Sequence, residues 1–400
     1  MTRQIIHHLT DNDLYTFSVC YFYLHRFPRA SGRYEFVDRN NTVYPPGFAE
    51  KVREQIARME SITISDEEIT FLQRKCYYLP IWFFTFLKGY RFSANEVTVT
   101  QDTAGHLHVS VEGLLWKAVF WEVPVLAIIS ELKHLLDGDM ERYDATHERE
   151  KSLTKGMKLV ANGVMFAEFG TRRRFSYAHQ AMVIESFMEA NRRIGEKWHF
   201  VGTSNVYLAM QYDLTPTGTM SHQVISFCGA IFGYKEANFL AMDYWQEAFD
   251  SDLGTYLYDT YGWSAFTDNF SKKHAKLFDG LRVDSGDNFL AVDRIVRKYK
   301  ELNIDPMTKS LTFSNGLTVD DAIAIHAYCE GKIKSNYGIG TFLTSDITGS
   351  EPLNIVIKLT EARLTEKKSW QKAVKLSDDI GKYTGNPAEV EIAKKTLGME

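Results

Sequence analysis

The stretch Gly280-Leu281-Arg282-Val283-Asp284-Ser285-Gly286-Asp287 contains the unit from which we expect this chain to be built. A short apolar run, Gly280–Val283, ends in a polar turn that contains a glycine, and a helical pattern follows. A strand that is buried on both faces reads as a continuous apolar run, and strands that alternate with helices form parallel sheets. The stretch therefore predicts one strand–turn–helix unit of an α/β fold.

The same unit recurs through the second part of the chain. Five further apolar runs have this character: Gly163–Phe169, Trp198–Gly202, Thr255–Tyr258, Ser310–Phe313 and Lys332–Asn336. Six such units predict an α/β barrel or a doubly wound sheet. In barrels the active site lies at the carboxyl ends of the strands. Polar or glycine-rich turns follow each run, so we expect the functional site there.

The first part of the chain differs, because it is rich in aromatic residues and mixes helices with strands. The expected helices cover Asp13–Phe27, Ser65–Arg74 and Trp121–Leu136, and the expected strands cover Arg33–Val37, Glu96–Thr100 and His106–Val111. This mixture predicts an α+β domain over residues 1–140, followed by the barrel from residue 141 onward.

The composition argues against several classes of protein. The 400 residues carry a net charge of −5, which argues against a nucleic-acid binder that depends on bulk positive charge. The 4 Cys form no CxxC pair, which argues against a zinc ribbon or a disulfide framework. No signal peptide is evident, and the most apolar stretch, Trp121–Leu136, is too short and too charged to span a bilayer. We therefore expect a cytoplasmic globular protein with neither nucleic acid nor membrane as a partner.

Three consecutive arginines follow the first expected barrel strand. The guanidinium groups of Arg172, Arg173 and Arg174 can hold phosphates through paired hydrogen bonds, and we expect one of the three to point into solvent. Residues 151–200 carry 9 Lys and Arg against 4 Asp and Glu, a local charge of +5. This reversal of sign favours an anionic substrate, although a solvated basic turn has the same composition.

Two other turns contain groups that suit a phosphorylated sugar. Gly338 and Gly340, ahead of Thr341, could offer backbone N–H groups to a phosphate, or could form an ordinary turn. Asp284 could bind ribose hydroxyls or Mg²⁺, or could belong to a helix cap. His222 follows a hydroxyl-rich approach, but a lone histidine is more often structural than catalytic.

Taken in order along the chain, these groups resemble a known family. The matching stretches are Thr10–Tyr15, Glu168–Phe175, Val201–Asn205, Gly218–His222, Leu281–Asp287, Gly338–Thr341 and Leu376-Ser377. The chain closely resembles the bacterial nicotinate phosphoribosyltransferases from about residue 10 to about residue 385.

This resemblance implies both a fold and a reaction. The fold is that of a type II phosphoribosyltransferase: an irregular, TIM-like α/β barrel with a second α+β domain, which residues from about 345 to 400 complete. The reaction is the first step of NAD salvage, in which nicotinate, 5-phosphoribosyl 1-diphosphate, ATP and water give nicotinate mononucleotide, diphosphate, ADP and phosphate. That stoichiometry belongs to the ligase class.

The resemblance also implies which residues surround the pyridine ring. Phe169 matches an aromatic residue that stacks on the ring. Tyr15 matches an opposing aromatic residue that the other subunit often supplies, and we expect a homodimer. Ser204 stands where a relative that uses nicotinamide carries Asp. A carboxylate there would repel the carboxylate of nicotinate, so Ser204 favours the acid as substrate.

Further matches concern the phosphates of the sugar donor. Arg172 matches an arginine that contacts phosphate, and Gly338 and Gly340, with Thr341 beside them, match the turn that holds the 5-phosphate.

The remaining matches concern the ribose, the metal and ATP. Arg282 and Asp284 match groups that hold the ring and the ribose side of the site, and His222 matches a histidine that ATP phosphorylates. Mg²⁺ is expected with the diphosphate, and Asp284 is its candidate protein ligand. Relatives often carry Asp where this chain has Asn315, which leaves a Mg²⁺ or ribose role for that position open.

Three other interpretations stay open at this point. The chain could be a nicotinamide- or quinolinate-specific relative, another phosphosugar-binding barrel enzyme such as an isomerase or aldolase, or an inactive barrel that serves as a binding protein.

Overall fold

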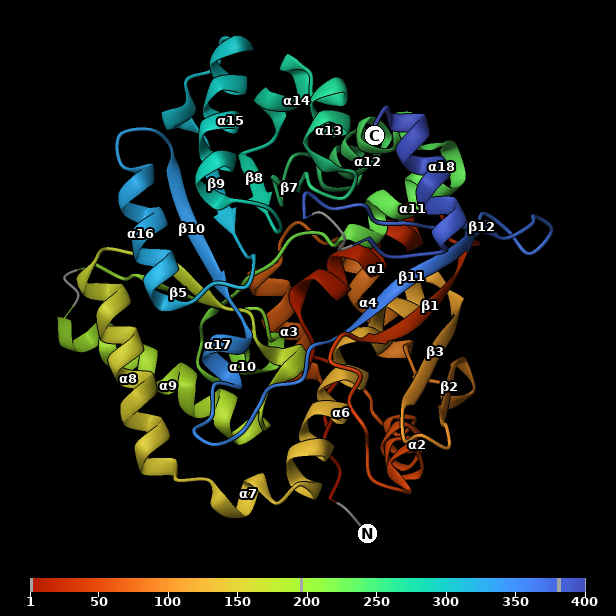
Figure 1. Ribbon diagram of the computed structural model, residues 1–400, viewed down its shortest axis with the longest axis vertical. Coiled ribbons are helices and arrows are strands. Elements are labelled where there is room, and N and C mark those ends of the chain that lie inside the picture. Colours follow the sequence, from red (N-terminus) through yellow and green to blue (C-terminus); the bar gives the residue numbers. More distant parts are fainter. Residues whose placement is uncertain (1–2, 195–196, 380–382, 400) are drawn as a thin grey trace.

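The computed structural model describes residues 3–194, 197–379 and 383–399 and contains two β-sheets surrounded by helices (Figure 1). The larger sheet is parallel and consists of β4 (Phe166–Glu168), β5 (Phe200–Thr203), β6 (Thr215–Pro216), β7 (Thr255–Leu257), β8 (Gly280–Val283), β9 (Ser310–Phe313) and β10 (Lys334–Ile339). Its strand order is β6-β5-β4-β10-β9-β8-β7, so the sheet curls into a half-barrel with β6 and β7 as its edges. The predicted fold class, an irregular α/β barrel with a second α+β domain, is confirmed.

Each of the six predicted apolar runs overlaps a strand of this sheet, and β5 and β10 extend beyond the predicted runs, to Thr203 and Ile339. β6 is a strand that the sequence analysis missed, because it is only two residues long and one of them is Pro216. Proline cannot donate a hydrogen bond to a neighbour, and it is tolerated here because β6 is an edge strand.

Helices follow the barrel strands and lie around the sheet (Figure 1). They are α8 (Ala145–Ala161), α9 (Tyr177–Ile194), α10 (Val206–Gln211), α11 (His222–Phe232), α12 (Ala237–Phe249), α13 (Gly262–Asn269), α14 (Lys272–Leu277), α15 (Asn288–Glu301), α16 (Val319–Cys329) and α17 (Thr341–Thr344). Short 3₁₀ turns are η3 (Thr171–Arg173), η4 (Tyr234–Glu236) and η5 (Pro306–Thr308).

The second sheet is antiparallel and has the strand order β12-β11-β1-β3-β2. Its strands are β1 (Ser31–Asp38), β2 (Val97–Gln101), β3 (Leu107–Leu114), β11 (Ile355–Arg363) and β12 (Gln371–Lys372). The associated helical segments are α1 (Leu14–Arg26), α2 (Phe48–Met59), α3 (Asp66–Lys75), α4 (Ile81–Gly89), η1 (Ala94–Glu96), α5 (Leu115–Ala118), η2 (Val119–Trp121), α6 (Glu122–Leu136) and α7 (Asp139–Arg142). The helices and strands predicted for this part of the chain are confirmed, including the capping box of α3, in which Ser65 and Glu68 satisfy each other's backbone N–H groups.

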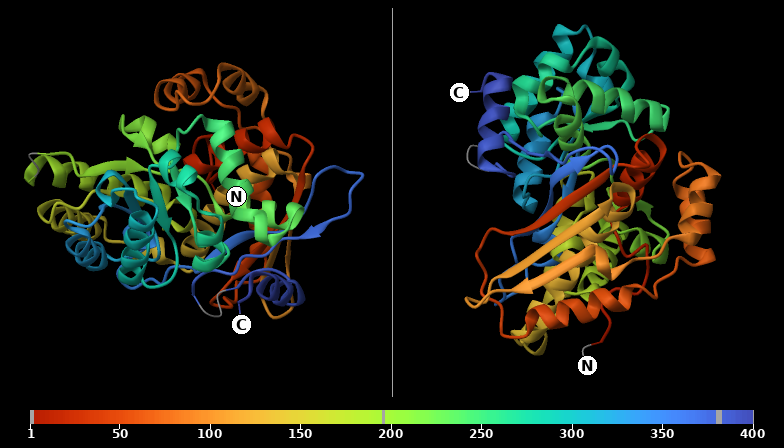
Figure 2. Two further views of the ribbon diagram at one scale, coloured as in Figure 1. Left: turned by 90° about the horizontal axis from the view of Figure 1, so that it is seen from above. Right: turned by 90° about the vertical axis from the view of Figure 1, so that its right-hand side faces the viewer.

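The end of the chain returns to its beginning through β11. This strand pairs with β1 from Ser31 opposite Arg363 to Asp38 opposite Ile355, and Figure 2 shows the two strands side by side. The last helix, α18 (Pro387–Leu397), lies instead against η4, where the hydroxyl of Tyr234 donates to Glu389 at 2.5 Å. The division into residues 1–140, 141–344 and 345–400 stays a prediction.

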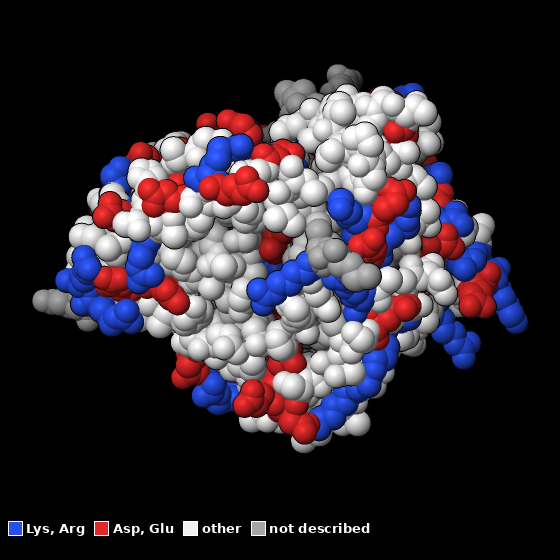
Figure 3. Space-filling view, turned by 90° about the horizontal axis from the view of Figure 1, so that it is seen from below, with Lys and Arg blue, Asp and Glu red and all other residues white. Residues whose placement is uncertain are grey.

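The charged residues of both signs are mixed on the molecular surface. On the face shown in Figure 3, Lys and Arg alternate with Asp and Glu instead of forming a field of one sign. Among the described residues, no helix combines the length and the apolar character that crossing a bilayer requires.

A buried arginine joins the start of the chain to the barrel. Arg174, which is 0% exposed, donates to Asp11 at 2.6 and 2.9 Å and to Glu131 at 2.6 Å. Asn205, directly after β5, also donates to Asp11 at 2.8 Å. Buried charges are tolerated only when they are paired in this way, so the network holds four separate segments in one relative position.

Replacing this arginine should be strongly destabilising. Arg174→Met leaves the carboxylates of Asp11 and Glu131 without their cation, and we expect a loss of about 3–5 kcal/mol in the free energy of unfolding, measured in urea. Arg149→Met is the matched control, because Arg149 pairs with Glu185 and Glu189 at the surface. It should cost less than about 1 kcal/mol, and equal losses for the two variants would contradict this account.

Candidate active site

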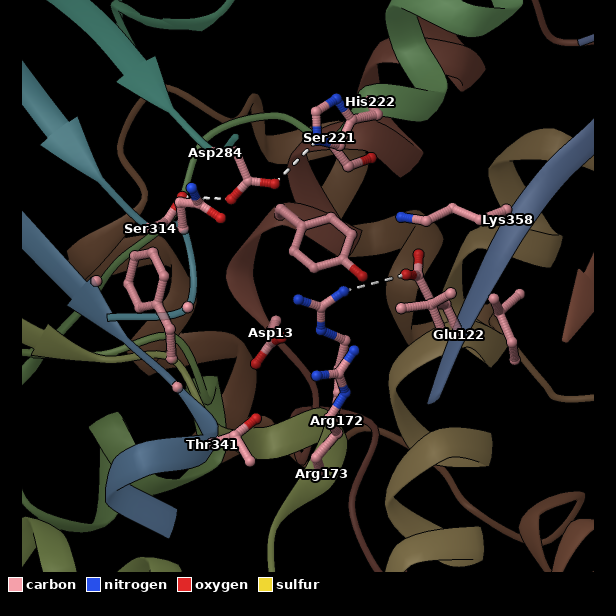
Figure 4. Close-up of a pocket in the computed structure, with 18 of the residues that line it drawn as sticks. Asp13, Glu122, Arg172, Arg173, Ser221, His222, Asp284, Ser314, Thr341 and Lys358 are labelled. Carbon is pink, nitrogen blue, oxygen red and sulfur yellow. Dashed lines mark hydrogen bonds and ion pairs between the residues drawn. The ribbon is translucent and has the colours of Figure 1, made fainter. Parts of the chain in front are cut away.

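A pocket of about 500 Å³ lies between the carboxyl ends of the barrel strands, β11 and the start of α1. The ten residues that the family resemblance assigned to the site all line this pocket: Tyr15, Phe169, Arg172, Ser204, His222, Arg282, Asp284, Gly338, Gly340 and Thr341. In Figure 4, His222 and Asp284 lie on one side of this space and Arg172 and Thr341 lie on the other.

Phe169 forms an aromatic wall of this pocket, directly after β4. Because β4 lies between β5 and β10, Phe169 is flanked by Ser204 and by Gly338. Backbone hydrogen bonds fix the three neighbours: Phe169 donates to Ile339, and Ser204 donates to Glu168, both at 2.8 Å. A Cβ atom on Gly338 would lie 2.4 Å from Cδ2 and Cε2 of the Phe169 ring, so only glycine leaves room for the ring.

The two glycines therefore differ in position. Gly338 lies inside β10, opposite Ala167 of β4, and not in a turn. Gly340 is the residue at the turn, since it precedes α17, which begins at Thr341.

The three arginines of the turn after β4 have three different surroundings. Arg172 faces the pocket, with Nη1 3.5 Å from Glu122. Arg173 lines the pocket too and donates from Nε to the carbonyl of Ile355 at 2.8 Å. Burial and the neighbouring charge of Arg172 lower the pKa of Arg173 to about 9. The expectation that one of the three points into solvent is wrong, because Arg174 enters the core and the other two are half-buried.

His222 is the first residue of α11 and uses both ring nitrogens. Nδ1 lies 2.9 Å from the hydroxyl of Thr260, and Nε2 lies 3.0 Å from Asp284 and 2.8 Å from Nζ of Lys375. Burial, and then the charge of Lys375, lowers the pKa of His222 to about 4, despite the nearby carboxylate of Asp259. The imidazole is therefore neutral at physiological pH and keeps a lone pair.

Asp284 connects His222 to the neighbouring barrel strands. One of its oxygens accepts from Nη2 of Arg282 at 3.0 Å and from the hydroxyl of Ser314. Burial alone would raise the pKa of Asp284, but the charge of Arg282 and the contact with His222 hold it well below its usual range. The site thus contains a permanently ionised carboxylate between an arginine and an imidazole.

Comparison with known proteins identifies the family. The N-terminal domain pattern of the nicotinate phosphoribosyltransferase (NAPRTase) family matches residues 10–130, and the pattern of the family itself matches residues 164–400. The chain belongs to the nicotinate phosphoribosyltransferase family. The resemblance found in the sequence is confirmed.

Individual relatives span nearly the whole chain. A nicotinate phosphoribosyltransferase of Desulforapulum autotrophicum is 41% identical over 98% of this chain and 99% of its own length, and one of Chromohalobacter salexigens is 40% identical over 98% of each. Among solved structures, a nicotinate phosphoribosyltransferase from Porphyromonas gingivalis superposes with a TM-score of 0.94 at 44% identity, covering 98% of this chain and 100% of that chain. One from Vibrio cholerae has a TM-score of 0.89 at 29% identity and covers 100% and 95%.

Several residues of the site in this member of the nicotinate phosphoribosyltransferase family lie in no sequence motif that would have identified them. Glu122, Lys358 and Lys375 line the pocket but come from α6 and from the returning C-terminal segment. Burial lowers the pKa of Lys358 to about 7, against the charge of Glu122. In the sequence, Lys358 and Lys375 resemble surface lysines. Only the pairing of β11 with β1 brings this part of the chain to the pocket.

Asn315 has a contact that an aspartate could not make. Its amide nitrogen donates to the backbone carbonyl of Gly286 at 3.1 Å, whereas an ionised carboxylate can only accept. The amide therefore ties the turn after β9 to the turn after β8, which carries Asp284.

The contact between Gly338 and Phe169 leads to a testable expectation. Gly338→Ala forces the aromatic ring of Phe169 to move, and we expect the KM for the aromatic substrate to rise at least about tenfold, with a smaller change in the midpoint of thermal unfolding. Gly89→Ala is the control, since a Cβ atom there meets nothing within 4 Å. An unchanged KM in Gly338→Ala would show that the side chain of Phe169 does not hold the ring of the substrate.

Proposed function

We propose that the chain transfers the phosphoribosyl group of 5-phosphoribosyl 1-diphosphate to nicotinate, giving nicotinate mononucleotide and diphosphate, coupled to ATP hydrolysis in the manner of a ligase. The observation that carries this proposal is the composition of one pocket: an aromatic wall at Phe169 stands beside the cations Arg172, Arg173, Lys358 and Lys375. A flat ring and a highly charged sugar phosphate need this combination. Membership of the family supports it.

The chemistry of this transfer does not require a strong general base next to the pyridine ring. The pyridine nitrogen already has a lone pair and attacks C1 of the ribose as the bond from C1 to the diphosphate oxygen breaks. The electron pair of that bond leaves with diphosphate. The protein therefore has to orient the ring and to stabilise the departing charge, which is the work of positioned cations.

The pocket suits Mg²⁺ as a partner of the diphosphate. Asp284 is an ionised carboxylate at its wall, and Mg²⁺ binds through one or two carboxylates together with phosphate oxygens. Within the described part of the chain, ligand atoms of His222, Asp259 and Asp284 lie within 4.8 Å of one another. The ammonium of Lys375 already stands between two of these groups, so we assign the ion to the diphosphate side, where it would neutralise the leaving group.

His222 is the group that we assign to ATP coupling. A neutral imidazole nitrogen can attack the γ-phosphorus of ATP, so that a P–N bond forms while the P–O bond to ADP breaks. Water later takes the phosphoryl group from the nitrogen as phosphate. The hydrogen bond between Nδ1 and Thr260 holds the ring so that Nε2 faces the pocket.

We also propose a cytoplasmic homodimer. The family resemblance is the ground for this proposal, since Tyr15 already lines the pocket of its own chain and does not require a second subunit.

The decisive assay measures diphosphate release from 5-phosphoribosyl 1-diphosphate. We expect release with nicotinate, stimulation by ATP, and far slower release with nicotinamide. No turnover with nicotinate, with or without ATP, would overturn the proposal. Faster turnover with nicotinamide would assign the chain to the amide instead.

A second assay tests the role of His222. ATP labelled at the γ-phosphate should label the protein in an acid-labile form, and His222→Asn should abolish both the label and the stimulation by ATP. His108→Asn, at an exposed position of β3, is the control and should keep both. A His222→Asn variant that ATP still stimulates fully would contradict the role.

A further inference from the structure

Asp13 stands at the N-cap of α1 but does not cap the helix. An aspartate at this position normally accepts a hydrogen bond from a backbone N–H of the first turn. Asp13 instead accepts a hydrogen bond from the hydroxyl of Ser204 at 2.8 Å. The backbone fixes this pair, because the N–H of Leu14 donates to the carbonyl of Ser204 at 2.8 Å and Asp13 forms a β-bridge with Asn205. The carboxylate of Asp13 therefore forms part of the pocket wall and does not cap α1.

The Asp13–Ser204 pair lies where the edge of a substrate ring stacked on Phe169 would be. Phe169 and Ser204 follow the adjacent strands β4 and β5, so a flat ring that stacks on Phe169 directs one edge toward Ser204. Asp13 and Ser204 line the pocket and are only 4% and 5% exposed. Figure 4 shows Asp13 next to Arg172, on the side of the pocket away from His222. A ring substituent at this edge meets a largely dry pair of polar groups.

The number of protons shared by Asp13 and Ser204 determines which substituent of the substrate ring the two residues can bind. The hydroxyl of Ser204 has one proton, and an ionised Asp13 can only accept it. Ser204 then offers lone pairs to the ring, which suit the N–H of an amide and repel a carboxylate. If Asp13 carries a proton, it donates to Ser204, and the hydroxyl proton of Ser204 is free for an acceptor.

We propose that Asp13 determines which ring substituent the pocket accepts: in its protonated form it donates to Ser204, which then donates to the carboxylate of nicotinate. This inference rests on the proposed function, which supplies the substrate. Nicotinate binding then takes up one proton from solvent whenever Asp13 is ionised in the free enzyme. The selectivity for acid over amide thus depends on a residue outside the barrel, in addition to Ser204 itself.

The surroundings of Asp13 support a carboxyl group that is easily protonated. Burial raises its pKa above the usual range, and the charge of Glu122 adds to this effect. The charge of Arg172 and the hydrogen bonds of Ser204 and Thr171 act in the opposite direction without cancelling the rise. The charged and titratable groups that face Asp13 are Arg172 of η3, Glu122 of α6, Glu168 of β4 and Tyr15 of α1.

The test is the pH profile of the KM for nicotinate in the wild type and in Asp13→Asn. In the wild type we expect KM to rise at least about tenfold as the pH increases through the raised pKa of Asp13, with a smaller change in kcat. Asparagine carries no charge and can donate to Ser204 at any pH. The variant should therefore lack the rise that belongs to Asp13 and, at pH values above the pKa of Asp13, have a KM at least about tenfold below that of the wild type.

Asp213→Asn is the matched control, because Asp213 is exposed, pairs with Arg74 at the surface and has a positive φ that asparagine tolerates. It should reproduce the wild-type profile. A folded Asp13→Asn variant with the wild-type profile would overturn the inference while leaving the proposed function intact. If the variant does not fold, the wild-type profile decides, and a KM for nicotinate that does not rise with pH above the usual pKa range of an aspartate overturns the inference. Absence of any turnover with nicotinate would overturn both.

Discussion

The ion pairs of Arg174 with Asp11 and Glu131 join three segments that are far apart in the sequence. Each of these charges would be costly to bury alone, and together they are tolerated only in one geometry. The segment that carries Asp11 continues directly into Asp13 and Tyr15, and the segment that carries Arg174 begins with Phe169. The position of the pocket wall from α1 relative to the wall from β4 therefore depends on this network.

The half-barrel and the antiparallel sheet contribute different chemistry to the pocket. The carboxyl ends of the parallel strands supply the aromatic wall at Phe169 and the connected pair Arg282 and Asp284. The other sheet supplies Lys358, and the segment after it supplies Lys375. A chain with a net charge of −5 in this way assembles a pocket in which cations outnumber carboxylates, because both parts of the fold contribute cations to it.

The sequence predicted the barrel strands well because strands buried on both faces leave continuous apolar runs, as in Gly280–Val283. It predicted the strand-end residues for the same reason, since their position follows from the strands. It failed where a residue's surroundings come from tertiary structure. Arg174 looks like its two neighbours in the sequence but is buried, and Lys375 has no local motif that relates it to His222. Asp13 looks like a helix cap, and only the structure reveals that its side chain does not cap the helix.

The central place of β11 in the antiparallel sheet has a consequence for synthesis of the protein. β1 pairs with β3 on one side and with β11 on the other, yet more than 300 residues separate β1 from β11 along the chain. Until residues 355–363 have left the ribosome, one edge of β1 lacks its hydrogen-bonding partner and can pair with another chain. Contacts between such distant segments also form slowly. The nascent chain thus lacks the partner of one edge of β1 for most of its synthesis, and pairing with the wrong strand is the hazard that the late position of β11 creates.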